Sequence, residues 1–121
     1  MQWGWVFLFG GLGALARVGV ATALPARGLP WGTLAVNVVG CLLIGIVFQW
    51  FEARGALASP WRLALIGGFL GGFTTFSAFG IETFDLLRSG QFGWAAGYVT
   101  ASLVLGLLAV AAGFGVARAL G

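Results

Sequence analysis

Long apolar stretches alternate with short polar or proline-containing segments along this sequence. Four such stretches occur, at about residues 2–24, 31–51, 60–87 and 92–117, and the third carries no charge over residues 63–81. A helix that spans a membrane requires about 20 predominantly apolar residues. The pattern therefore predicts an all-α membrane protein with four transmembrane helices.

Composition agrees with this pattern and excludes several classes of protein. Hydrophobic residues make up 60% of the 121 residues and charged residues only 7%, against roughly 25% charged residues in soluble domains. Six arginines and three acids give a net charge of +3, and the arginines are scattered singly, unlike those of a nucleic-acid-binding surface. We therefore expect neither an ordinary soluble enzyme, a disordered tail nor a nucleic-acid binder.

The apolar stretches leave only short turns between them, so we expect one transmembrane domain over residues 1–121 in the cell inner membrane. The N-terminal segment lacks the positive region of a cleaved signal peptide, and we expect it to be retained as the first helix. Cys41 has no partner for an intrachain disulfide, and there is no histidine for a zinc site. The tryptophans lie near predicted helix ends, at the level of lipid headgroups, and are Trp3, Trp5, Trp31, Trp50, Trp61 and Trp94.

The arginines are distributed almost equally between the two sides of the membrane, so they favour neither orientation strongly. The ends and loops expected on one side carry three arginines, and those on the other side carry two, or three if Arg17 extends from the first helix to that side. The chain can therefore insert in both directions. Because four helices of this size enclose little interior, we expect a dual-topology antiparallel homodimer.

The third apolar stretch contains the segment GFLGGFTTFSAF at residues 68–79. Two glycine pairs followed by Thr74, Thr75 and Ser77 favour a break in the helix at mid-membrane. Such a break frees carbonyl groups that favour a cation and amide groups that favour an anion. The alternative is an unbroken helix with tight glycine packing. Three glycine pairs have the spacing of close helix contacts, and these are Gly67 with Gly71, Gly68 with Gly72, and Gly93 with Gly97.

Polar and aromatic side chains inside the other stretches are candidates for an ion path. Thr33 and Asn37 share one helix face, as do Tyr98 and Ser102, and the alternative role of each pair is hydrogen bonding between helices. Phe76 and Phe79 lie three residues apart, and the positive edges of their rings suit an anion, although lipid-facing or core phenylalanines are the alternative.

Two charged residues also fall within the predicted spans. Arg17 is a functional candidate by its depth in the membrane, with snorkelling to the surface as its alternative. Glu82 lies near the end of the third span, where it is able to pair with an arginine of a partner subunit. No nucleophile and base occur together, so we do not expect an enzyme.

Three segments, in order, carry a resemblance to a known family: GGLGALAR at residues 10–17, GTLAVNVVGCLLIG at residues 32–45 and GFLGGFTTFSAFGIET at residues 68–83. On these segments the chain resembles the Fluc-type fluoride channels, also called the CrcB family. The resemblance implies a dual-topology homodimer that exports fluoride passively through two antiparallel pores. It also implies a structural sodium ion at the centre of the dimer and no organic cofactor.

The resemblance assigns roles to individual residues. The backbone carbonyls of Gly71 and Thr74 match the sodium site. The positions that match the fluoride path are Asn37 (pore amide), Phe76 and Phe79 (paired rings), Tyr98 and Ser102 (polar track), Thr33, Thr75 and Ser77 (beside the pore) and Arg17 (pore entrance). The chain departs from the common family pattern at Ala78, which lacks a hydroxyl, and at Val18, where the family often has tyrosine.

Two other functions compete with the fluoride channel. A small multidrug-type exporter also has four spans, but it normally needs a carboxylate in the first span, and no acid precedes Glu52. A membrane assembly protein without transport activity explains the glycines but not the set of Asn37, Thr75, Phe76 and Phe79.

Overall fold

The computed structural model describes residues 1–121 and contains four helical spans that are long and apolar enough to cross a membrane. The predicted all-helical fold and its four spans are confirmed, and the fourth helix extends a few residues further than expected. The elements are α1 (Gln2–Ala23), α2 (Trp31–Ala53), α3 (Pro60–Arg62), η1 (Leu63–Leu70), α4 (Gly71–Phe73), α5 (Phe76–Arg88) and α6 (Phe92–Leu120).

Short connections join the spans, and local sequence explains how each is closed. Gly28 and Gly90 adopt positive φ angles of 76° and 77°, which side chains with a Cβ rarely adopt. Before the third span, the Ser59 side chain accepts a hydrogen bond from the Trp61 amide, and Pro60 occupies the first turn. Every tryptophan lies within four residues of the start or end of a span, in agreement with the predicted aromatic belts.

The third span is broken at Thr74 and Thr75, which confirms the predicted break and rules out an unbroken helix. Thr74 has a ψ angle of 157° and Thr75 has φ and ψ angles of −149° and 118°, so both residues are extended. The Thr75 hydroxyl then accepts from the Ala78 amide and begins α5. Before the break, η1 follows a π-helical course, which the sequence did not predict and which often accompanies functional sites.

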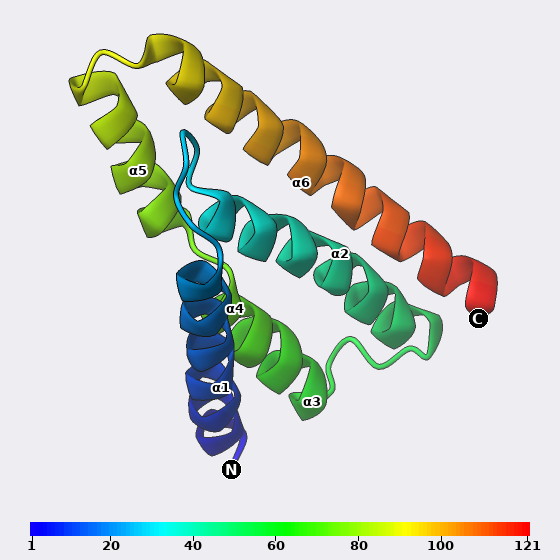
Figure 1. The fold of residues 1–121 in the computed structure, drawn as a ribbon. Coiled ribbons are helices and arrows are strands. Elements are labelled where there is room, and N and C mark those ends of the chain that lie inside the picture. The colour runs from blue at the N-terminus through cyan, green and yellow to red at the C-terminus, as the bar shows by residue number, and fades with distance from the viewer.

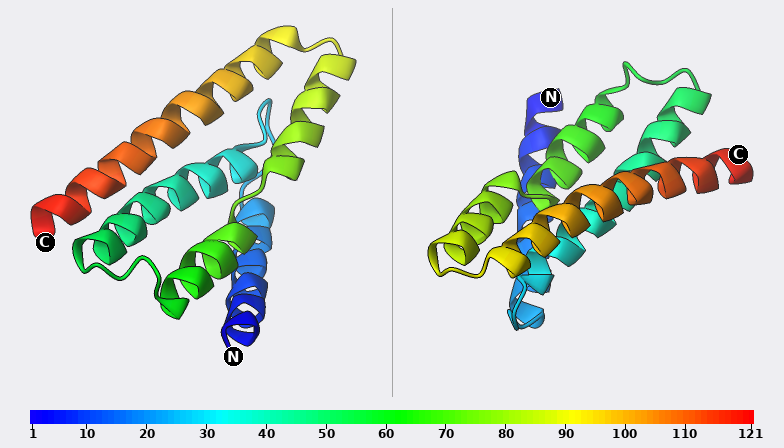
Figure 2. Two further views of the ribbon diagram at one scale, coloured as in Figure 1. Left: turned by 180° about the vertical axis from the view of Figure 1, so that it is seen from behind. Right: turned by 90° about the horizontal axis from the view of Figure 1, so that it is seen from above.

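The helices form two close pairs (Figures 1 and 2), with α1 along η1 and α4, and α2 along α6, while α5 joins the second pair through α6. Glycines allow the backbones to touch in both pairs. A Cβ on Gly13 would overlap the Phe69 carbonyl, and one on Gly113 would overlap the Leu42 carbonyl. Small residues of this kind permit close helix approach within a membrane.

The glycine pairs named from the sequence differ in their surroundings. Gly68 and Gly72 lie against the α1 backbone, as expected, whereas a Cβ on Gly93 or Gly97 would meet nothing within 4 Å. Gly93 and Gly97 therefore make no close helix contact inside this chain.

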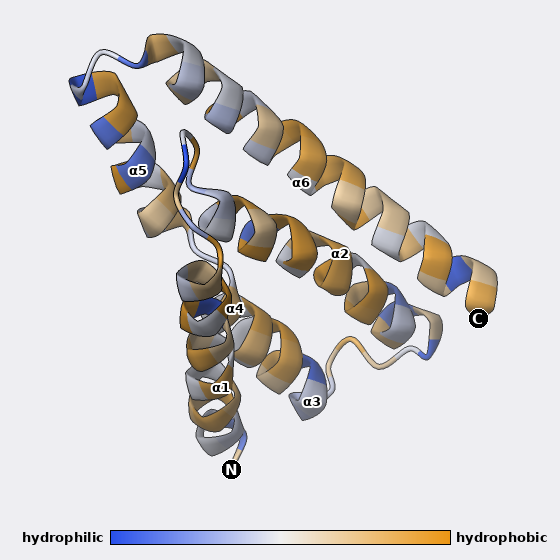
Figure 3. Ribbon diagram, in the orientation of Figure 1, coloured by the Kyte–Doolittle hydropathy of each residue, from blue (hydrophilic) through white to orange (hydrophobic).

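Hydrophobic residues occur along all four spans (Figure 3), many large apolar side chains are exposed, and only 17 of 121 residues are buried. Lipid, and not a protein core, is the natural environment of such a surface. Thr33 and Tyr98 are the only buried residues whose side chains carry a polar group, so their surroundings indicate where the chain places polar chemistry in its interior.

Candidate functional site

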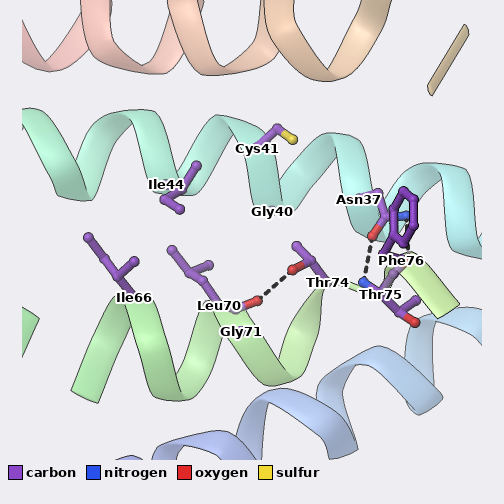
Figure 4. A pocket seen from close by; sticks show the side chains of 10 residues that line it. All are labelled: Asn37, Gly40, Cys41, Ile44, Ile66, Leu70, Gly71, Thr74, Thr75 and Phe76. Carbon is purple, nitrogen blue, oxygen red and sulfur yellow. Dashed lines mark hydrogen bonds between the residues drawn. The ribbon is translucent and has the colours of Figure 1, made fainter. Parts of the chain in front are cut away.

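Asn37 and Thr75 form the centre of the site, where α2 meets the break in the third span (Figure 4). The Asn37 Nδ2 donates to the Thr75 carbonyl at 3.0 Å, and the Thr75 amide donates to the Asn37 Oδ1 at 2.8 Å. The side-chain amide of asparagine has two N–H groups, so one donor of Asn37 remains for another acceptor. The interhelical role and the pore role considered for Asn37 are thus compatible.

The break leaves the carbonyl groups of residues 71–74 without their helical donors, including those of Gly71 and Thr74. In a continuous helix the Thr75 amide would donate to Gly71 and the Ala78 amide to Thr74. Here the Thr75 amide donates to Asn37, and the Ala78 amide donates to the Thr75 hydroxyl. The carbonyls of Gly71 and Thr74 lie at the negative end of the first half of the span and are therefore free to hold a cation.

Among the neighbouring carbonyls, those of Leu70 and Gly72 accept hydrogen bonds, whereas that of Phe73 has also lost its helical donor and accepts none. Leu70 accepts from both the amide and the hydroxyl of Thr74, each at 2.9 Å. Gly72 accepts from the Arg17 Nε at 3.1 Å. No group of three acidic, cysteine or histidine side chains capable of holding a metal is present. A cation at the break would therefore depend on backbone oxygens, which are the hard ligands that hard cations prefer.

A pocket of about 290 Å³ lies between α2 and the broken span, and Figure 4 views it from close by. Its polar groups gather at the end that contains the Asn37–Thr75 pair, and aliphatic side chains cover the other end. The lining residues are Asn37, Gly40, Cys41, Ile44, Ile66, Leu70, Gly71, Thr74, Thr75 and Phe76.

A second polar cluster forms where α2, α5 and α6 meet. The two carboxylate oxygens of Glu82 accept from the Thr33 hydroxyl and the Tyr98 hydroxyl, each at 2.7 Å. Tyr98 is completely buried and Thr33 is 6% exposed. The position of Glu82 in the sequence suggested only a pairing with an arginine of another subunit, so this cluster was not predicted. The sequence feature that could have indicated the cluster is the presence of two hydroxyl residues and one acid within three apolar stretches.

Three aromatic rings connect the break to this cluster. The Phe76 and Phe79 ring centroids are 5.7 Å apart, and those of Phe79 and Tyr98 are 5.2 Å apart. Phe79 packs against the buried cluster of Leu29, Leu34 and Tyr98, whereas Phe76 lines the pocket and is 83% exposed. If Phe76 lines a path for ions, a second molecule must supply the facing wall.

The remaining candidates lie in different places. The Ser102 hydroxyl is buried without a hydrogen-bond partner, one helical turn beyond Tyr98 on α6. The Ser77 hydroxyl lies 3.4 Å from the Thr75 hydroxyl at the exposed start of α5. Arg17 belongs to α1 and lies on the side of the broken span opposite Asn37. Its Nε donates to the Gly72 carbonyl, so it is not a freely snorkelling side chain.

Comparison with known proteins identifies relatives along nearly the whole chain. The family described as "CrcB-like protein, Camphor Resistance (CrcB)" matches residues 4–114. A protein of Acidobacterium capsulatum named "Fluoride-specific ion channel FluC" is 46% identical over 91% of this chain and 90% of its own length. Proteins of the same name from Geobacter sulfurreducens and Methylobacterium nodulans are 46% and 43% identical, over 95% and 96% of this chain and 95% of their own lengths.

These matches agree with the architecture described above. The relatives are named as ion channels, so the expectation that this protein is not an enzyme is confirmed. Together with the four apolar helices, the matches identify a multi-pass membrane protein. The expected resemblance is confirmed over the length of the chain, and the chain belongs to the CrcB family.

Proposed function

We propose that this protein is a fluoride-selective ion channel of the cell inner membrane that lets fluoride leave the cell passively. The observation that carries the proposal is the Asn37–Thr75 pair, which keeps an amide donor available beside a break at mid-membrane. The names of the relatives, "Fluoride-specific ion channel FluC", support the same ion.

The chemistry of the site suits a small, strongly hydrated anion. Conduction requires binding that is favourable yet reversible, and neutral donors meet this requirement better than a fixed lysine or arginine in the narrow part. The free amide hydrogen of Asn37 and the positive ring edges of Phe76 and Phe79 are such donors. The start of α5 adds backbone amides at the positive end of a helix, with Thr75 and Ser77 beside them.

Further along the path, hydroxyl groups continue the polar lining. Ser102 has a buried hydroxyl without a partner, which is available to an anion. The hydroxyls of Thr33 and Tyr98 donate to Glu82, so the carboxylate competes with fluoride for the same hydrogens. This competition keeps the hydroxyls from holding fluoride too tightly, in agreement with reversible binding.

The channel is proposed to be an antiparallel homodimer with two pores. The exposed Phe76 and the apolar wall of the pocket, including Ile66 and Leu70, suit coverage by a second copy. With the two copies related by a two-fold axis in the membrane plane, the broken spans meet at the centre. The nearly balanced arginines permit insertion in both orientations.

A structural sodium ion is proposed between the two breaks. Gly71 and Thr74 of each copy would hold it through their backbone carbonyls, because both carbonyls have lost their helical donors. When bound, sodium supplies a fixed positive charge that lowers the cost of an anion in a medium of low dielectric. The small multidrug-type exporter is disfavoured because α1 contains no carboxylate.

Ion efflux from liposomes tests the proposed function. Purified protein is reconstituted with potassium fluoride or potassium chloride inside, and valinomycin is added to carry the potassium charge. We expect rapid efflux of fluoride and retention of chloride, measured with ion-selective electrodes. Equal and slow leakage of both anions would contradict a fluoride channel.

A further inference from the structure

Arg17 makes the only side-chain hydrogen bond that joins α1 to another helix. Its Nε donates to the Gly72 carbonyl at 3.1 Å. Gly72 belongs to α4, the last helical turn before the break. The bond from Arg17 therefore reaches the end of the first half of the third span, on the side opposite Asn37.

Close backbone contact brings Arg17 to this position. A Cβ on Gly13 would overlap the Phe69 carbonyl, and a Cβ on Gly72 would overlap the Gly10 carbonyl. Arg17 lies one helical turn after Gly13, so its side chain extends along α4 towards the break. The glycines bring the two helices together, and Arg17 then fixes the end of α4.

With this bond, some carbonyl groups around the break have a hydrogen-bond donor and others have none. Arg17 donates a hydrogen bond to the Gly72 carbonyl, and Asn37 donates one to the Thr75 carbonyl. The carbonyls of Gly71, Phe73 and Thr74 remain without a hydrogen-bond donor, and the proposed cation site uses those of Gly71 and Thr74. Without Arg17, the Gly72 carbonyl would lack a partner in an apolar environment, which is costly. The three-residue α4 would then be free to rotate until the Gly72 carbonyl found another hydrogen-bond donor.

We propose that Arg17 is a positioning residue that holds α4 in the orientation in which Gly71 and Thr74 bind the cation. This inference rests on the sodium site of the proposed function and adds to it the residue that shapes the site. A cationic side chain at the negative end of a helix stabilises that end. Arg17 acts on the carbonyls from the α1 side, and the cation acts from the opposite side.

Two measurements on purified protein test this role, with Arg17→Met as the variant. The first is the sodium concentration that gives half of the sodium-dependent increase in Tm, with potassium replacing sodium at constant ionic strength. We expect this concentration to rise roughly fivefold or more, the effect of one lost hydrogen bond from a charged donor. The second is amide hydrogen exchange of residues 70–78, which we expect to become roughly fivefold faster.

Matched variants separate positioning from loss of charge. Arg118 is exposed near the end of α6 and makes no side-chain hydrogen bond, so Arg118→Met should change neither measurement. Arg17→Lys keeps a charged donor and should restore sodium binding to within about twofold of the original chain. Unchanged or tighter sodium binding in Arg17→Met would overturn the proposal, because a charge that merely repels sodium would give tighter binding when removed.

The two measurements also distinguish this inference from the proposed function. If the original chain gains no more stability from sodium than from potassium, the sodium site of the proposed function is wrong. Amide exchange then decides the role of Arg17 alone. Unchanged exchange in residues 70–78 of Arg17→Met would mean that Arg17 does not hold the break.

Discussion

The side-chain amide of Asn37 and the backbone of Thr75 exchange two hydrogen bonds in opposite directions, at 3.0 and 2.8 Å. One side chain of α2 thus satisfies both backbone groups that the break leaves free at Thr75. The principal pore candidate is therefore also the residue that fastens the broken span to its neighbour. Changes at Asn37 should affect conduction and stability together.

Asn37→Ala is expected to abolish fluoride efflux and to lower the free energy of unfolding by about 3 kcal/mol, because two hydrogen bonds are lost and two backbone groups are left unpaired. Thermal unfolding in detergent and liposome efflux measure the two effects. Gln91→Ala is the matched control, since the side-chain amide of Gln91 bonds only to the hydroxyl of exposed Ser89. A fully active and stable Asn37→Ala protein would contradict both roles.

Phe76→Ile and Phe79→Ile should each reduce fluoride efflux by at least about tenfold while the dimer persists, because an aliphatic side chain lacks the positive ring edge. Their effects on stability should differ. Phe79 packs against Tyr98, whereas Phe76 is 83% exposed within the chain. Phe7→Ile, at a position 85% exposed on α1, controls for loss of a ring elsewhere. Unchanged efflux in both variants would show that the two rings do not line the pore.

Tyr98→Phe removes one of the two hydroxyls that donate to Glu82. We expect a loss of roughly 2 kcal/mol in the free energy of unfolding, as is typical for a buried hydrogen bond to a carboxylate. A double-mutant cycle with Glu82→Gln should give a coupling energy of about 1 kcal/mol or more. Additive effects of the two changes would mean that the hydrogen bond contributes nothing.

Gly13→Ala should destabilise the protein by about 2 kcal/mol or more, because the added Cβ would overlap the Phe69 carbonyl and force α1 from the third span. Gly11→Ala is the matched control, since a Cβ there would meet nothing within 4 Å. The measurement is the Tm of each variant in detergent. Equal effects at both positions would argue against the close contact of α1 with η1.

Cross-linking tests the antiparallel dimer. In a Cys41→Ser background, Ile66→Cys and Phe76→Cys place single thiols towards opposite ends of the pocket. An antiparallel pair should give cross-linked dimers when the two variants are co-expressed, and little product from either variant alone. The reverse pattern, with each variant cross-linking to itself only, would indicate a parallel dimer.

Several features of the fold could be predicted because they depend on neighbouring residues. Apolar length predicted the four spans, and the glycines before Thr74 and Thr75 predicted the break. The cluster of Glu82 with Thr33 and Tyr98 was missed, because a hydrogen bond between residues 49 positions apart depends on how helices pack. The apolar pattern that predicted a helix over residues 63–70 did not reveal its π-helical course.

The sequence by itself determined that this is a membrane protein with four spans, a broken third helix and aromatic belts, since length, hydropathy and local helix preference act over a few turns. Only the tertiary structure decided the partners of the polar groups. Pairing of α1 with the first half of the third span and of α2 with α6 brings Arg17 to Gly72 and Asn37 to Thr75, which lie 55 and 38 residues apart. In a membrane, freed backbone groups must find such partners within the protein, and the helix packing selects them.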